Sequence, residues 1–119
     1  MFKVFSKDFN KEDPSFIKGC NKVKLDPKSV ELLAYDKFLF SYLFVLAISE
    51  KTVFLYNSDN KKIESFPVSD VDSLYIEKKT DLNLSIKGGR IINLTSVVGV
   101  KPKVVNAVKS LIEEINHLR

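Results

Sequence analysis

The sequence predicts an α+β fold that is mainly β, with about seven antiparallel strands capped by a C-terminal amphipathic helix. Three observations predict this class. Between residues 43 and 95, short apolar segments are separated by turn residues, which is typical of strands joined by hairpins. After Pro102, apolar residues recur at helical spacing. The chain has 119 residues, 45% of them hydrophobic, and therefore suits a single domain with its own core.

Residues 1–30 are expected to form an N-terminal extension of this domain, and residues 31–119 its core. Within the extension, Asp13 stands at a helix-cap position, Pro14 follows at the first helical position, and Gly19 marks the end. This pattern predicts one short helix. The first residues, "MFKVFSKDFNKEDP", mix charged and aromatic side chains without a continuous apolar stretch, so we expect no signal peptide.

The segment after Asp26 allows two interpretations. Asp26 and Pro27 suit the start of a helix, whereas "ELLAYDKFLF" suits a strand equally well. We favour a short helical turn at residues 27–29, followed by the first strand. The continuous apolar run Phe38–Ile48 comes next. It is much shorter than the ~20 residues with which an α-helix crosses a bilayer, so we expect a core segment and no transmembrane segment.

The central part of the chain predicts a series of hairpins. "YLFVLAI" and "TVFLYN" are joined by the short polar stretch 49–51, and "NSDNKK" at residues 57–62 reads as a second turn. "KIESF" is a short strand that ends at Pro67, which has no N–H for a ladder. "VDSLYIEKK" and "TDLNLSIK" alternate apolar and polar residues and predict two more strands.

The segment "NLSIKGGRIINL" combines two glycines with flanking basic residues. A phosphate-binding loop would lead into a helix, but here a strand follows the glycines, so we predict a hairpin. A two-residue turn at the glycines would put an asparagine on the apolar face. A three-residue loop, 87–89, instead opposes Leu84 to Ile92 and Leu82 to Leu94, and places its last glycine where a left-handed backbone is needed.

The C-terminal region predicts a helix over about residues 102–118, because Pro102 suits the first turn and the apolar residues follow at spacings of three and four. One face of this helix must cover the sheet. The predicted apolar stripe consists of Val104, Val108, Leu111, Ile115 and Leu118, widened by Val105 and Ile112.

Residues 43–118 resemble the small bacterial pleckstrin-homology-like (PH-like) domains of the YokE type. The resemblance lies in "VLAISEKTVFLY" as the central hairpin, "SFPVSDVDSLYIEK" as the passage to the second sheet, "LNLSIKGGRIINL" as the last hairpin, and the final helix. It implies a bent antiparallel sheet, or half-open barrel, plugged at one end by the helix. Phosphoinositide-binding relatives carry basic residues after the first strand. The corresponding "FLFSYLFVL" has none, so we do not expect phosphoinositide binding.

The residue inventory offers little for catalysis. Cys20 is the only cysteine, which excludes a disulfide within the chain and favours a reducing, cytoplasmic setting. We interpret it as a small buried side chain. His117 is the only histidine and suits the last turn of the C-terminal helix, where a cation interacts well with the helix dipole. No nucleophile motif is present. We expect no enzyme, no catalytic residue, no cofactor and no metal site.

The net charge of +4 is mild and comes almost entirely from lysine. This composition is typical of an AT-rich genome, such as that of a bacterium or its phage. Nucleic acid or an anionic membrane surface is a less favoured partner, because acidic residues stand beside most of the basic ones and no recognition motif is present. The candidate ligand or partner loops are those with Lys61, Lys62, Lys78, Lys79, Lys87 and Arg90.

The favoured function is a non-enzymatic, regulatory module that binds a protein partner or assembles with itself, since open sheet edges accept extended peptides. The alternative is binding of nucleic acid or an anionic membrane surface through the lysine-bearing loops. The N-terminal phenylalanines, Phe2, Phe5, Phe9 and Phe16, allow two interpretations. We favour packing on the domain's own sheet over an exposed self-association surface.

Overall fold

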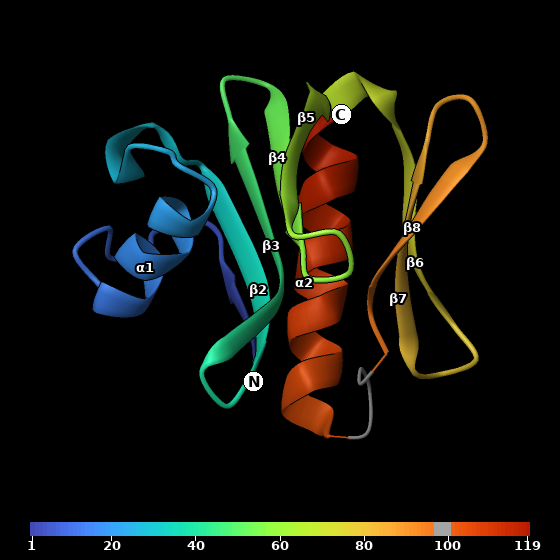
Figure 1. Cartoon of the computed structure of the whole chain (residues 1–119), viewed down its shortest axis with the longest axis horizontal. Coiled ribbons are helices and arrows are strands. Elements are labelled where there is room, and N and C mark those ends of the chain that lie inside the picture. The colour runs from blue at the N-terminus through green and yellow to red at the C-terminus, as the bar shows by residue number, and fades with distance from the viewer. Residues whose placement is uncertain (97–100) are drawn as a thin grey trace.

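The computed structural model describes residues 1–96 and 101–119 (Figure 1). Two of its helices are short 3₁₀ helices, labelled η. The elements in chain order are β1 (Phe2–Phe5), α1 (Pro14–Lys22), η1 (Pro27–Ser29), β2 (Leu32–Phe38), β3 (Ser41–Ser49), β4 (Thr52–Asn57), β5 (Lys62–Pro67), η2 (Val68–Asp70), β6 (Val71–Glu77), β7 (Asp81–Ile86), β8 (Arg90–Thr95) and α2 (Pro102–Leu118).

Within the described residues, the strands form two antiparallel sheets and do not close into a barrel. Sheet A has five strands in the order β1-β2-β3-β4-β5, and sheet B has three in the order β6-β7-β8. Figure 1 shows α2 lying between the two sheets. The predicted α+β, mainly β class is confirmed. The described strands number eight, one more than expected, because residues 2–5 form β1 at the edge of sheet A.

The main core surrounds α2, and the predicted C-terminal helix is confirmed. Val108, Leu111 and Ile115 of α2 are fully buried. They share one cluster with side chains of both sheets, such as Leu46 of β3 and Leu84 of β7. The helix therefore covers an apolar face on each side, as a stripe of this width allows.

A second core covers the other face of sheet A. Phe5 and Phe16 are buried, with ring centroids 5.4 Å apart, and Phe9 packs 4.7 Å from Phe16. Phe2 lies on the opposite face of sheet A, with its ring 5.9 Å from that of Phe44. The favoured interpretation of the N-terminal aromatics, packing on the domain's own sheet, is therefore confirmed.

Because sheet A is covered on both faces, β2 and β3 read as almost continuous apolar runs. This lack of alternation explains why the segment after Asp26 could be interpreted as either a helix or a strand. The favoured reading, a helical turn at residues 27–29 followed by a strand, is confirmed. The predicted turns after β3 and β4 are also present, and β5 ends at Pro67.

The predicted end of the first helix at Gly19 is wrong, because α1 continues to Lys22. Asp13 and Pro14 begin the helix as expected, and the Asp13 carboxylate accepts a hydrogen bond from the Ser15 amide at 2.8 Å. Gly19 lies within the helix for a packing reason. A Cβ atom at this position would come 2.5 Å from Cδ2 of Leu33, so only glycine lets α1 approach β2 this closely.

The last hairpin follows the predicted three-residue loop, but part of its register is wrong. Ile86 pairs with Arg90 and Leu84 with Ile92, and both loop glycines have a positive φ. Leu82, however, pairs with Thr95 and not with Leu94, because the register shifts after Leu82. Leu94 is nevertheless buried. A bulge shifts the pairing locally and does not exchange the buried and exposed faces of the whole strand.

The run from Phe38 to Ile48 is not one core segment, contrary to the prediction. The chain reverses within it: β2 ends at Phe38, which pairs with Ser41 at the start of β3. Phe38, Leu39 and Phe40 are exposed, whereas Phe44–Ile48 are buried. Among the described residues, no helix has the length and apolar character needed to span a membrane.

We expect Gly19→Ala to lower the free energy of unfolding by about 1–3 kcal/mol, because the added methyl overlaps the fully buried Leu33 side chain. Urea denaturation followed by circular dichroism measures this change. Asn21→Ala, at an exposed position of the same helix, serves as the control and should change stability by less than about 0.5 kcal/mol. A Gly19→Ala protein as stable as the parent would contradict the close-packing explanation.

Candidate functional site

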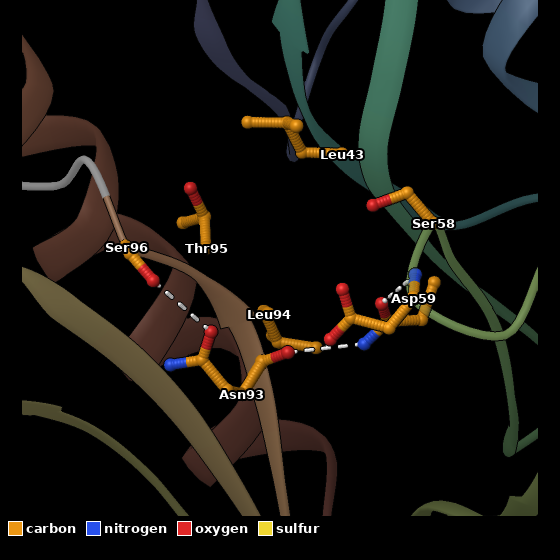
Figure 2. Close-up of a pocket in the computed structure, with 8 residues that line it drawn as sticks. Leu43, Ser58, Asp59, Asn93, Leu94, Thr95 and Ser96 are labelled. Carbon is orange, nitrogen blue, oxygen red and sulfur yellow. Dashed lines mark hydrogen bonds between the residues drawn. The ribbon is translucent and has the colours of Figure 1, made fainter.

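A small cleft of about 190 Å³ lies where sheet A meets the end of β8 (Figure 2). The side chains of its two asparagines, Asn57 and Asn93, are used for internal hydrogen bonds. The Asn57 side-chain amide donates to the Asn93 carbonyl at 3.0 Å, and the Asn57 side-chain oxygen accepts from the Asp59 amide at 2.9 Å. The cleft is lined by Leu43, Asn57, Ser58, Asp59, Asn93, Leu94, Thr95 and Ser96.

A line of polar side chains continues from this cleft across sheet B. Asn93 donates to Asn83 at 2.8 Å, and Asn83 donates to the Glu77 carboxylate at 3.1 Å. Thr95 donates to the buried Asp36 carboxylate at 2.8 Å and so links β8 to β2. Buried polar groups with partners of this kind fix how two sheets meet. We therefore interpret the cleft as part of the contact between the two sheets and not as a ligand-binding site.

The six predicted loop residues do not come together. Lys61 ends the β4–β5 turn and Lys62 begins β5, while Lys78 and Lys79 lie in the β6–β7 turn. Lys87 lies in the β7–β8 turn and Arg90 begins β8, at the opposite end of β7 from the β6–β7 turn. Figure 1 shows these turns well separated. They form no single site.

Arg90 is engaged in a contact within the chain. Its guanidinium donates two hydrogen bonds to the Glu64 carboxylate, at 2.5 and 2.8 Å, and this pair joins β8 to β5. These bonds hold the pKa of Glu64 below its ordinary value. A bidentate pair orients both side chains, so Arg90 ties the sheets together.

The structure adds two lysines to the β4–β5 turn that the sequence did not suggest. Lys22 and Lys24, at and just after the end of α1, lie across a surface hollow of about 500 Å³ from Lys61 and Lys62. The Lys22 ammonium sits 4.3 Å from the ring centroid of Tyr56. We call this site the lysine hollow; it is lined by Lys22, Lys24, Tyr56, Lys61, Lys62 and Ile63.

A second surface, which we call the apolar tip, consists of Phe38, Leu39 and Phe40. These side chains are 69%, 77% and 95% exposed, and they form the turn between β2 and β3. The sequence signal for this tip was present in "KFLFS", but a continuous apolar run gives no sign of where the chain reverses.

The backbone of the apolar tip is strained at Leu39, whose φ is +57°. Two-residue hairpin turns need a left-handed residue and usually place glycine or asparagine there. Leucine at such a position costs on the order of 1 kcal/mol, and its exposed side chain recovers none of this through burial. Eight other described residues besides the glycines also have a positive φ, but Leu39 is the one among them with a large apolar side chain, and that side chain faces solvent.

A groove of about 510 Å³ runs between β1 and the first turns of α2. We call it the lysine groove because Lys3, Lys101 and Lys103 line it around an apolar floor. Among the described residues, none of these three lysines forms an ion pair. The full lining is Met1, Phe2, Lys3, Val4, Lys101, Lys103, Val104 and Ala107.

The groove also exposes a strand edge. The Lys37 amide donates to the Met1 carbonyl at 3.0 Å, and the Met1 amino group donates to the Lys37 carbonyl. Bonded and non-bonded pairs alternate in an antiparallel ladder, so the main-chain groups of Phe2 and Val4 point away from β2. No other described strand pairs with this edge.

The lysine groove and the apolar tip meet at Met1, which lines the groove and pairs with Lys37, the residue before the tip. Figure 1 places the N-terminus, the β2–β3 turn and the start of α2 at the same end of the molecule. We call the tip and the groove together the docking end.

Neither the single cysteine nor the single histidine lines these surfaces. Cys20 is fully buried, as predicted, and burial raises the pKa of its thiol to about 11. His117 is exposed in the last turn of α2. The described residues contain no cluster of three or more potential metal ligands. No family model, curated protein or solved structure matches this chain.

We expect Arg90→Ala to raise the pKa of Glu64 toward its ordinary value, since the two hydrogen bonds favour the charged carboxylate. Carbon-detected NMR titration of the carboxyl group measures the change. Because the folded-state pKa is lowered, the stability that the pair contributes is present above the unfolded-state pKa. It is lost as the pH falls through the folded-state value. Lys87→Ala is the matched control; an unchanged Glu64 pKa in Arg90→Ala would refute the assignment.

Proposed function

We propose that this chain is a non-enzymatic module that binds a partner protein through its docking end. The observation that carries the proposal is the apolar tip, where three consecutive large apolar side chains face solvent and one of them strains the backbone. Contiguous exposed apolar residues mark contact sites with other molecules. Aromatic side chains at the centre of a protein interface commonly contribute most of the binding energy.

The lysine groove supports a partner with acidic residues. Lys101 and Lys103 line it beside an apolar floor, Lys3 lines it with its ammonium 4.9 Å from the ring centroid of Phe5, and its lining contains no acidic side chain. An interface with an apolar centre and a charged rim has this composition, and charge complementarity speeds association and excludes wrong partners. The partner surface should therefore carry an apolar pocket for the tip and carboxylates facing the groove.

The exposed edge of β1 supports an extended partner segment. The outward main-chain groups of Phe2 and Val4 are able to pair with an added strand, which gives affinity without a particular side-chain sequence. With four residues, β1 offers about 13 Å of edge, enough for about four residues of an added strand.

A foreign partner is favoured over a second copy of this chain. A two-fold dimer formed through the docking end would bring the positive charges of Lys101 and Lys103 from both copies into one interface. Like charges placed opposite each other disfavour such a contact. An acidic partner removes this repulsion.

We also propose that the fold is PH-like and that the module acts in the cytoplasm of a bacterium or phage-infected cell, in a regulatory role. The order of elements supports the first point: strands β2–β5 precede the three strands of sheet B, and a helix follows. A single buried thiol suits a reducing compartment.

We expect Leu39→Gly to abolish or weaken partner binding at least about tenfold, because it removes the central side chain of the tip. Glycine suits the φ of +57°, so the variant should keep its fold and its melting temperature. Ile91→Ser, which removes a side chain that is 59% exposed on β8, is the matched control and should bind normally.

The measurement has two steps. Proteins from nuclease-treated extract of the cells that express this chain are captured on the wild-type protein and on both variants. A protein that is captured by the wild-type chain and by Ile91→Ser but not by Leu39→Gly is then purified and titrated against all three by calorimetry.

Two further measurements test the other possible occupants of the docking end. Sedimentation of the chain alone tests self-association, and flotation with phosphatidylglycerol vesicles tests membrane binding. Equal capture by all three proteins, or tip-dependent dimers or vesicle binding, would overturn the proposal.

A further inference from the structure

The lysine hollow is a separate concentration of positive charge. Four lysines from two distant segments, the end of α1 and the β4–β5 turn, line one depression of about 500 Å³. The hollow contains no acidic side chain, and among the described residues none of the four lysines forms an ion pair. Asp59, the acid closest to Lys61 in sequence, lines the cleft of Figure 2 instead.

The main chain beneath these lysines is held by hydrogen bonds. The Lys24 amide donates to the Asn21 carbonyl at 3.1 Å, and the Lys61 amide donates to the Asn57 carbonyl at 2.8 Å. The Lys62 amide donates to the Asn60 side chain at 3.0 Å. The turns that carry the charges are therefore formed before any ligand arrives, and binding would order only the side chains.

Tyr56 gives the hollow an aromatic surface. It lies on β4, its side chain is half-buried, and the Lys22 ammonium contacts its ring face at 4.3 Å from the centroid. A ring that attracts a cation on its face also suits stacking with a nucleobase, and every base presents such a face. Ile63 adds an apolar wall beside it.

We propose that the lysine hollow binds single-stranded nucleic acid: a base takes the place of the Lys22 ammonium on the Tyr56 ring, Lys22 turns to a phosphate, and Lys24, Lys61 and Lys62 face phosphates as well. Lysine is a point charge without the planar fork of arginine, so it follows a phosphate backbone without reading sequence. A concave site with one aromatic ring fits a single strand, whose bases are unstacked and reachable, better than a duplex. This activity is independent of the docking end.

The probe is a fluorescein-labelled oligothymidylate of about twelve nucleotides, titrated with the full chain by fluorescence anisotropy. We expect binding without sequence preference and weaker binding to a duplex of the same length. The logarithm of the association constant should fall with the logarithm of salt concentration with a slope of about −3, since four lysines each contribute about −0.7 on a single strand.

The decisive variant is the double substitution Lys61→Ala and Lys62→Ala. It should weaken binding at least about tenfold and reduce the slope to about half, because two of four phosphate contacts are removed. The matched control is Lys78→Ala with Lys79→Ala, an adjacent lysine pair in another β-turn, which makes the same change in net charge. The control should bind within about twofold of the wild-type protein.

Tyr56→Leu separates stacking from charge. It should weaken binding several-fold and leave the salt slope unchanged, because no cation is lost. Circular dichroism melting checks that each variant is folded.

Three outcomes would overturn the proposal. The first is an equal loss of oligonucleotide binding with the two lysine-pair variants, which would show a general charge effect. The others are displacement of the oligonucleotide by inorganic phosphate, and equally strong binding of the chain to phosphatidylglycerol vesicles. The absence of binding at low salt would also refute it.

Discussion

Burial of α2 between the two sheets is the interaction on which the rest of this structure depends. Sheet B has three strands and a single apolar face, and a sheet of that size needs another layer to be stable in water. Val108, Leu111 and Ile115 supply that layer and at the same time cover one face of sheet A. Sheet A gains a second cover from α1, so it has an apolar core on each of its two faces.

The polar line that runs from Asp36 through Thr95 and the asparagines is the counterpart of this apolar layer. Packing around a helix determines the distance between the sheets. It determines their relative position along the helix only weakly, because apolar contact has little directionality. The bond from Asn57 to Asn93 and the Arg90–Glu64 pair have direction. They fix the two sheets where β8 comes near sheet A. A cleft formed by such groups is part of the contact between the sheets, and the surfaces that we propose for binding lie elsewhere.

The sequence was informative wherever one face of an element meets water. The stripe of α2 and the alternation around Leu84 allowed both to be assigned with their correct faces. Prediction failed where an element is buried on both faces or where a neighbour overrides a local preference. Gly19 looked like a helix end but is a close approach to Leu33. Phe38 to Phe40 looked like core but form a turn, since no composition signal separated them from the buried residues that follow.

The sequence contained parts of the two proposed binding surfaces but could not assemble either of them, for different reasons. The apolar tip is local, and its strained leucine was invisible because φ is a property of the folded chain. The lysine hollow is non-local, because α1 must lie against sheet A before Lys22 can reach the ring of Tyr56. The contact at Gly19, one turn before Lys22, makes this approach possible. Because Gly19 has no side chain, α1 packs closely on β2, and this packing determines where Lys22 lies on the surface. A change at the α1–β2 contact should therefore also change the geometry of the lysine hollow.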